Sequence, residues 1–176
     1  FFQAMGTGHT AYTTLHADSV ETVLNRLQNP PLQVPGAMIQ DLDIISIQTQ
    51  TFMGDDRVRR TKSVSEILTP PEDDPTAIPT RNVFERDAVR DVHERVGEST
   101  VLAEIAEERG WTDEELAAEL GNREAVLRFL LEEDVTDYRD VASVLQLYAK
   151  DPDYVMKHVR THGYDAETGA PIGEVN

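Results

Sequence analysis

Four prolines between residues 69 and 80, in the run TPPEDDPTAIPT, constrain the fold of this chain more than any other stretch. Proline lacks the amide hydrogen that helices and strands use, and it disfavours a helical conformation at the residue before it. The run is therefore predicted to be a loop that no helix or strand crosses. We expect four parts: residues 1–70, a linker with short antiparallel strands at 71–98, a helical subdomain at 99–161 and a flexible tail at 162–176.

The part before this loop combines strand and helix patterns. Thr and Tyr are frequent in residues 9–16, which predicts a strand, and Asp18-Ser19 is a good N-cap for a helix over residues 20–28. Asn29-Pro30-Pro31 would end that helix, and a short helix is expected over 35–40. The runs DLDIISIQTQTFMG and RVRRTKSVSEIL then predict an antiparallel hairpin with a charged outer face.

The part after the loop begins with two short strands, over about 81–85 and 90–95, and is helical from Ser99 onward. Its helix signals are Gly110 after an apolar run, the acidic first turn Asp113-Glu114-Glu115, and Pro152 at the start of another segment. Four helices are predicted, at about 101–110, 112–133, 137–148 and 152–161.

Composition excludes several functions. The formal charge is −17, and the basic residues are 3 Lys and 13 Arg. A uniformly acidic, lysine-poor surface favours adaptation to high salt, with an ordinary acidic protein as the alternative. It argues against nucleic-acid binding, which needs a basic surface. The chain has no Cys and no apolar stretch near the ~20 residues that span a bilayer, so we expect a cytoplasmic protein.

No complete active site is visible in the residues themselves. His9 and His16 are seven residues apart and so face opposite sides of the predicted strand, and His158 and His162 fall where a helix is expected to fray, so no metal site is predicted. Neither a serine on a glycine-flanked elbow nor a glycine-rich GxxxxGK phosphate loop is present. His16 ends a predicted strand, where an imidazole could sense a terminal phosphate. The alternative is a polar strand end capped by Asp18.

Several stretches are similar to one family. Residues 2–9, FQAMGTGH, followed by 14–19, TLHADS, and Arg26-Leu27, resemble the histidine box of the type II/type IV secretion ATPases, specifically the archaeal branch that drives archaellum and type IV pilus assembly. Further similar stretches extend the resemblance over about residues 1–159. They are Asn29-Pro30-Pro31, Asp43-Ile44-Ile45, Arg59-Arg60, Ser65-Glu66-Ile67, Gly110-Trp111 and Thr136-Asp137-Tyr138.

The resemblance implies an α/β fold: the C-terminal portion of a RecA-like P-loop NTPase core (1–70) with an antiparallel β extension and a helical C-terminal subdomain. It also implies a homo-hexamer that binds ATP and Mg²⁺ between subunits and acts on a membrane platform protein at the cytoplasmic membrane. The residues carried over are His16 and His9 as catalytic histidines, Thr7, Gly8, Thr14 and Asp18 as their support, and Arg26, Arg59 and Arg60 as intersubunit contacts.

The Walker A and Walker B motifs of that family are missing from this sequence. We therefore expect them to be encoded upstream, and we expect this chain alone neither to bind ATP tightly nor to hydrolyse it. The alternative is a non-catalytic interaction or regulatory module derived from the same family. A phosphate loop encoded upstream of Phe1 would favour the motor, and unrelated upstream sequence would favour the module.

Overall fold

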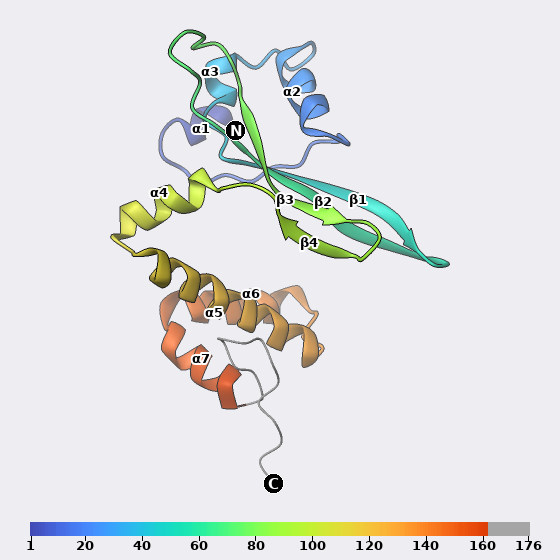
Figure 1. Ribbon diagram of the computed structural model, residues 1–176, viewed down its shortest axis with the longest axis vertical. Coiled ribbons are helices and arrows are strands. Elements are labelled where there is room, and N and C mark those ends of the chain that lie inside the picture. The colour runs from blue at the N-terminus through green and yellow to red at the C-terminus, as the bar shows by residue number, and fades with distance from the viewer. Residues whose placement is uncertain (162–176) are drawn as a thin grey trace. The chain divides into compact units, whose positions relative to one another are not determined.

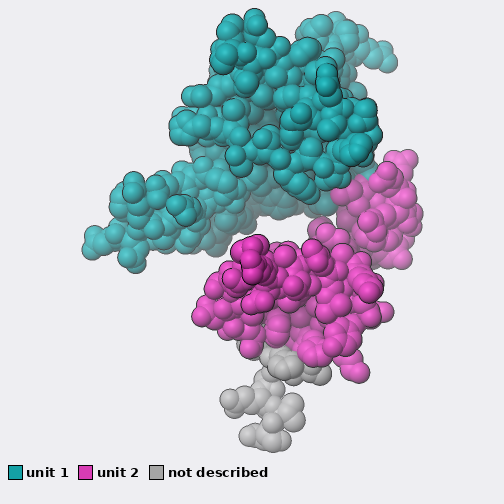
Figure 2. All heavy atoms as spheres, turned by 180° about the vertical axis from the view of Figure 1, so that it is seen from behind, with its two compact units in different colours: residues 1–104 teal, residues 105–176 magenta. Residues whose placement is uncertain are grey.

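The computed structural model describes residues 1–161, which divide into two compact units. Unit 1 comprises Phe1–Glu104, and unit 2 begins at Ile105; Figure 2 colours them teal and magenta. Each unit has an apolar core of its own. The finer division predicted at residues 70 and 98 stays a prediction, and the predicted flexible tail, 162–176, lies outside the described residues.

Unit 1 is built on a four-stranded antiparallel sheet in the order β1-β2-β3-β4 (Figure 1). The strands are β1 (Ile44–Met53), β2 (Asp56–Ile67), β3 (Thr80–Asp87) and β4 (Val92–Arg95). Gly54 has φ +60° in the turn between β1 and β2, a conformation that glycine adopts without strain. The sheet confirms the predicted hairpin and the predicted pair of short strands, and the proline-rich run separates β2 from β3 as expected.

Three short helices accompany this sheet: α1 (Phe2–Met5), α2 (Val20–Gln28) and α3 (Gly36–Ile39). Ser19 caps α2 by accepting a 3.1 Å hydrogen bond from the amide of Thr22. The apolar side of α2 packs with α3 and the start of β1, where Ile39 is fully buried. The residues of this core are Val23, Leu27, Ile39, Ile45, Ile47 and Ile67.

The strand predicted over residues 9–16 is absent. The structure describes residues 9–17 as neither helix nor strand, and His9, Thr10 and Tyr12 are exposed. A strand is stable when neighbouring strands satisfy its amide and carbonyl groups. Within residues 1–161 no strand pairs with this segment, so its β-prone composition does not lead to a strand.

Unit 2 is helical, as predicted. Helix α4 (Thr100–Arg109) crosses the boundary between the units, and α5 (Asp113–Glu132), α6 (Tyr138–Lys150) and α7 (Pro152–Thr161) follow. Thr112 and Glu115 form a complete capping box at the start of α5, and Asp137 caps α6. Helices α5, α6 and α7 share a core whose buried residues are Ala125, Val126, Leu130, Tyr148, Val155, Met156 and Val159.

A buried carboxylate connects β2 to the start of α4. Both oxygens of Glu66 accept hydrogen bonds: Oε1 from the Ser99 hydroxyl, and Oε2 from the amides of Thr100 at 2.7 Å and Val101 at 3.3 Å. The Ser99 hydroxyl in turn accepts from the amide of Leu102 at 3.0 Å. The first turn of α4 therefore has its free amides satisfied by a side chain from the sheet and by its own N-cap.

Across residues 1–161, no helix combines the length and the apolar character that crossing a membrane requires.

Candidate functional site

The first histidine of the predicted box is held by the turn that follows α1. Gly8 has φ +81°, which lets the chain reverse so that the amide of His9 donates to the carbonyl of Ala4 at 3.1 Å. The Thr7 hydroxyl donates to the same carbonyl at 2.9 Å and lies 3.1 Å from Nδ1 of His9. Because the hydroxyl has a single proton, both contacts are satisfied when Nδ1–H of His9 donates to Thr7. In a neutral His9 ring, Nε2 is then the acceptor.

His9 lines a hollow of about 690 Å³ in unit 1. The residues that face this hollow include Gly8 from the turn after α1, Tyr12 from the irregular segment, and Asp41 and Asp43 from the stretch before β1. The walls therefore carry one imidazole and two carboxyl groups. Thr14 instead lines a second hollow, of about 280 Å³, whose other walls include Ile45 and Ile47.

The second histidine lies apart from both hollows. His16 is exposed, and within residues 1–161 its ring has no recorded hydrogen bond, ion pair or ring contact. The residues predicted to act with it are thus spread along one irregular segment, and the structure does not gather them into a single pocket. Their predicted roles stay predictions.

Asp18 organises the start of α2. Its Oδ1 accepts a 2.9 Å hydrogen bond from the hydroxyl of Thr22, and its carbonyl oxygen lies 3.3 Å from Nζ of Lys62. The Thr22 hydrogen bond, together with the nearby charges of Lys62 and Arg26, lowers the pKa of the Asp18 carboxyl below its ordinary value. This contact is local to α2 and leaves open whether Asp18 also supports His16.

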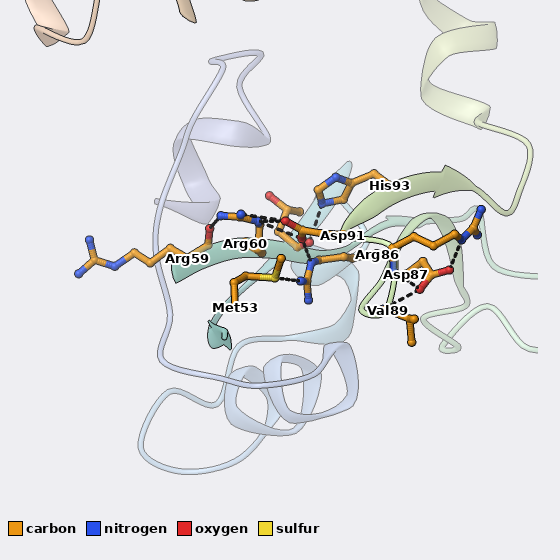
Figure 3. Close-up of polar contacts among 10 residues, drawn as sticks. Met53, Arg59, Arg60, Arg86, Asp87, Val89, Asp91 and His93 are labelled. Carbon is orange, nitrogen blue, oxygen red and sulfur yellow. Dashed lines mark hydrogen bonds and ion pairs between the residues drawn. The ribbon is translucent and has the colours of Figure 1, made fainter. Parts of the chain in front are cut away.

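The three arginines expected at subunit contacts lie on different elements. Arg26 is in the last turn of α2, whereas Arg59 and Arg60 are neighbours on β2 and point in different directions (Figure 3). Arg60 is engaged within its own chain: its Nε and Nη2 donate to the carboxylate of Asp91 at 3.0 and 2.8 Å. Arg59 extends away from this ion pair. The predicted intersubunit roles stay predictions, and Arg60 would need to leave Asp91 to fulfil one.

Asp91 is the centre of a cluster that the sequence did not indicate. It lies between β3 and β4 with φ +53°, and it accepts from Arg60 and also from Nε of Arg86 at 2.6 Å. These two guanidinium groups, Arg60 first and then Arg86, lower the pKa of Asp91 from 3.8 to about 2. Arg86 also donates to the sulfur of Met53 at 3.7 Å, so the cluster joins β1, β2 and the β3–β4 turn.

Replacing Asp91 by asparagine should make unit 1 less stable near neutral pH, with a difference that disappears in acid. The depressed pKa means that the carboxylate stabilises the folded state above about 3.8 and loses this effect as the pH falls through about 2. Urea midpoints of wild type and Asp91→Asn, measured from neutral pH down to this range, should converge. A gap that is the same at every pH would contradict the role assigned to the charge.

The described residues by themselves do not fit a complete site for ATP with Mg²⁺. Within residues 1–161, no group of three His, Asp or Glu side chains could hold a metal ion. The sequence has no glycine-rich loop to surround the phosphates. What the chain offers is two exposed imidazoles on one segment, which can donate to or accept from an anionic group.

Comparison with known proteins relates the chain to one family. Residues 91–170 match the family model described as PilB3-like, C-terminal. This match supports the predicted relation to pilus-assembly and secretion ATPases at the level of the family. It covers β4 and the helices of unit 2, and leaves out the histidine segment.

Three proteins of Methanocaldococcus jannaschii, each named only as uncharacterized, are also similar. One is 40% identical over 131 residues, which cover 73% of this chain and 47% of the relative. A second is 30% identical over 148 residues, which cover 82% of this chain and 27% of that relative. The third is 29% identical over 147 residues, which cover 84% of this chain and 20% of that relative. The chain thus spans about half, or less, of the length of these relatives.

Proposed function

We propose that this chain is the C-terminal part of an archaeal type II/type IV secretion ATPase, a motor that powers pilus or archaellum assembly or protein secretion. The observation that carries this proposal is the match of residues 91–170 to the PilB3-like C-terminal family. The three similar proteins, all from an archaeon and all longer than the matched segment, support it. Residues 1–70, which include β1 and β2, would form the end of the RecA-like core, and β3, β4 and the helices of unit 2 would follow it.

In this proposal the two histidines serve the nucleotide site of the complete protein. His16 would lie beside the terminal phosphate, where an exposed imidazole that has no partner within residues 1–161 can donate a hydrogen bond to an anionic oxygen. His9, held by Thr7 and the Gly8 turn, would couple that site to domain movement. The phosphate cradle and the Mg²⁺ ligands would come from elsewhere in the protein.

The assembly proposed is a homo-hexamer at the cytoplasmic face of the membrane, acting on a platform protein. The charge of −17 with only 3 lysines supports a haloarchaeal origin, because a strongly acidic surface stays hydrated when molar salt screens its self-repulsion. ATP and Mg²⁺ are the cofactors proposed for the whole protein.

ATP hydrolysis by the product of the complete gene tests the function. The wild type should hydrolyse ATP, and His16→Gln should lower kcat at least about tenfold, which corresponds to about 1.4 kcal/mol in the barrier. His158→Gln, a change of the same kind on the exposed part of α7, should leave kcat within twofold, on the order of 0.4 kcal/mol. Equal loss in both variants, or no loss in His16→Gln, would contradict the proposed role of His16.

The 176-residue chain alone provides a second arm of this test. It should show no saturable ATP hydrolysis, because its described residues lack a metal site and its sequence lacks a phosphate loop. If the complete gene product also fails to hydrolyse ATP, the motor proposal is wrong and a regulatory module derived from the family becomes the better explanation.

A further inference from the structure

The hairpin of β1 and β2 has two chemically different faces. The strand register places Gln50 opposite Arg59 and Phe52 opposite Arg57, and residues directly opposite in an antiparallel pair lie on the same face. Met53 and Arg60 lie on the other face, where they contact Arg86 and Asp91. The hairpin outer face, defined as Phe52, Arg57 and Arg59, is exposed among the described residues.

Within the described residues, neither arginine of the hairpin outer face has a side-chain partner. Within residues 1–161, the guanidinium groups of Arg57 and Arg59 have no recorded hydrogen bond, ion pair or ring contact, and Figure 3 shows Arg59 extended away from the Asp91 cluster. Many other arginines of this acidic chain do pair with carboxylates. Ion pairs are formed by Arg60, Arg86, Arg90, Arg95, Arg123 and Arg128.

Phe52 adds an apolar group to this cationic face. Phe52 is 65% exposed near the end of β1, a strand rich in Thr and Gln. Aromatic residues and arginine dominate the binding energy of protein interfaces, because each combines a large contact area with directional contacts. An exposed Phe directly opposite an arginine without a partner is therefore a combination typical of an interface.

We propose that the hairpin outer face binds a carboxylate-rich surface on a second copy of this chain. The support is charge complementarity: with 33 acidic and 16 basic side chains, each copy carries 17 more carboxylates than cationic groups. Each copy thus carries both halves of the contact: two guanidinium groups without a partner in residues 1–161, and an excess of carboxylates. An anionic membrane or a nucleic acid has no cationic groups to offer, so the net negative charge of this protein would repel it.

The contact is heterologous, because the hairpin outer face and the acidic surface that it binds are different parts of the molecule. Contacts of this kind join copies head to tail and generate a ring when the rotation between copies closes. This inference rests on the proposed assembly of several copies and deepens it by assigning one surface of the interface. It requires neither nucleotide nor the histidines.

Sedimentation equilibrium of the 176-residue chain tests the assignment. The measurement belongs at about 1 M salt, where the Debye length of about 3 Å removes the long-range repulsion between acidic copies and leaves direct contacts. The wild type should self-associate, and Arg57→Gln/Arg59→Gln should raise the dissociation constant at least tenfold. Phe52→Ser should weaken association in the same direction without changing the charge.

The matched control is Arg90→Gln/Arg95→Gln, which removes the same charge from the β3–β4 turn and from β4. Both of these side chains are exposed but ion-paired within the chain, so this variant should associate like the wild type. A wild-type chain that stays monomeric up to about 1 mM would overturn the inference. Association that is equal in all variants would also overturn it while leaving the proposed assembly intact. The proposed function fails separately, through absent ATP hydrolysis by the complete gene product.

Discussion

Leu130→Ala is expected to destabilise the helices of unit 2 by about 2–5 kcal/mol. Leu130 is only 3% exposed and lies in the core shared by α5, α6 and α7, next to residues such as Val126 and Val159. Alanine removes three buried carbon atoms, and the cavity left behind adds to the lost transfer free energy. Because small domains are stable by only about 5–15 kcal/mol in total, this single change removes a large share of the stability.

Its matched control is the next residue along α5. Leu131 is 76% exposed, so Leu131→Ala makes the same chemical change without opening a cavity, and it should shift stability by less than about 0.5 kcal/mol. Urea titration followed by circular dichroism compares the two variants. If they were equally destabilised, Leu130 would not occupy the core position described here.

Hydrogen exchange of Leu130→Ala shows whether the two units unfold independently. The core of unit 1 consists of residues from α2, α3, β1 and β2, and it shares none with the core that contains Leu130. Amides of β1 and β2 should therefore keep their protection in Leu130→Ala while those of α5 to α7 lose it. Loss of protection in both units would mean that they unfold together.

The helices of unit 2 could be predicted because each carries a local start signal. Thr112 and Glu115 form the capping box expected from their spacing, and Pro152 lies at the first position of α7. Gly110 ends α4 with φ +65°, a conformation in which glycine meets no steric penalty. Such signals depend only on residues a few positions apart, so they can be recognised in the sequence alone.

The failures come from features that depend on distant residues. Residues 9–16 have a strand composition but no strand beside them in the described chain, and α1 has no side-chain cap to announce it. Hydrophobic periodicity and propensity describe what a segment can form, whereas pairing decides whether a strand forms.

In the candidate site, too, local features could be predicted from the sequence and contacts between distant residues could not. The histidine segment could be singled out from its residues, but the Asp91 cluster joins positions 31 residues apart and has no local pattern. The contact of Glu66 with Ser99 spans 33 residues and is equally invisible in the sequence. A buried carboxylate without a neighbouring cation indicates a specific hydrogen-bonding role. For Glu66 this could be recognised only once its side of β2 was known to face the core.

Removing the Glu66 carboxylate is the second large effect that we expect. The residue is 3% exposed, and it accepts from the Ser99 hydroxyl and from the amides of Thr100 and Val101. In Glu66→Ala these buried and half-buried donors lose their acceptor, and the favourable placement of a negative charge at a helix N-terminus is lost as well. We expect a loss on the order of 3 kcal/mol, mostly in the join between β2 and the start of α4.

Two further variants make the explanation specific. Glu66→Gln keeps one acceptor oxygen but loses the charge and offers an NH₂ group to donors, so its loss should lie between those of the wild type and Glu66→Ala. Glu98→Gln, at a carboxylate that is 90% exposed beside Ser99 and pairs with Arg95 at 3.0 Å, should cost less than about 1 kcal/mol. Exchange rates of the Thr100 and Val101 amides measure the effect directly, since a tenfold faster exchange corresponds to about 1.4 kcal/mol.

The exchange rates of these two amides also show whether Glu66 acts as a helix cap or only fills space. If Glu66 acted only by filling space, Glu66→Gln would leave the exchange of Thr100 and Val101 unchanged, because glutamine has nearly the same volume. Because both amides donate to the same oxygen, Oε2, their protection should instead fall together when that oxygen loses its charge. A variant in which the two amides exchange as slowly as in the wild type would show that α4 does not need the carboxylate of β2 to begin at Thr100.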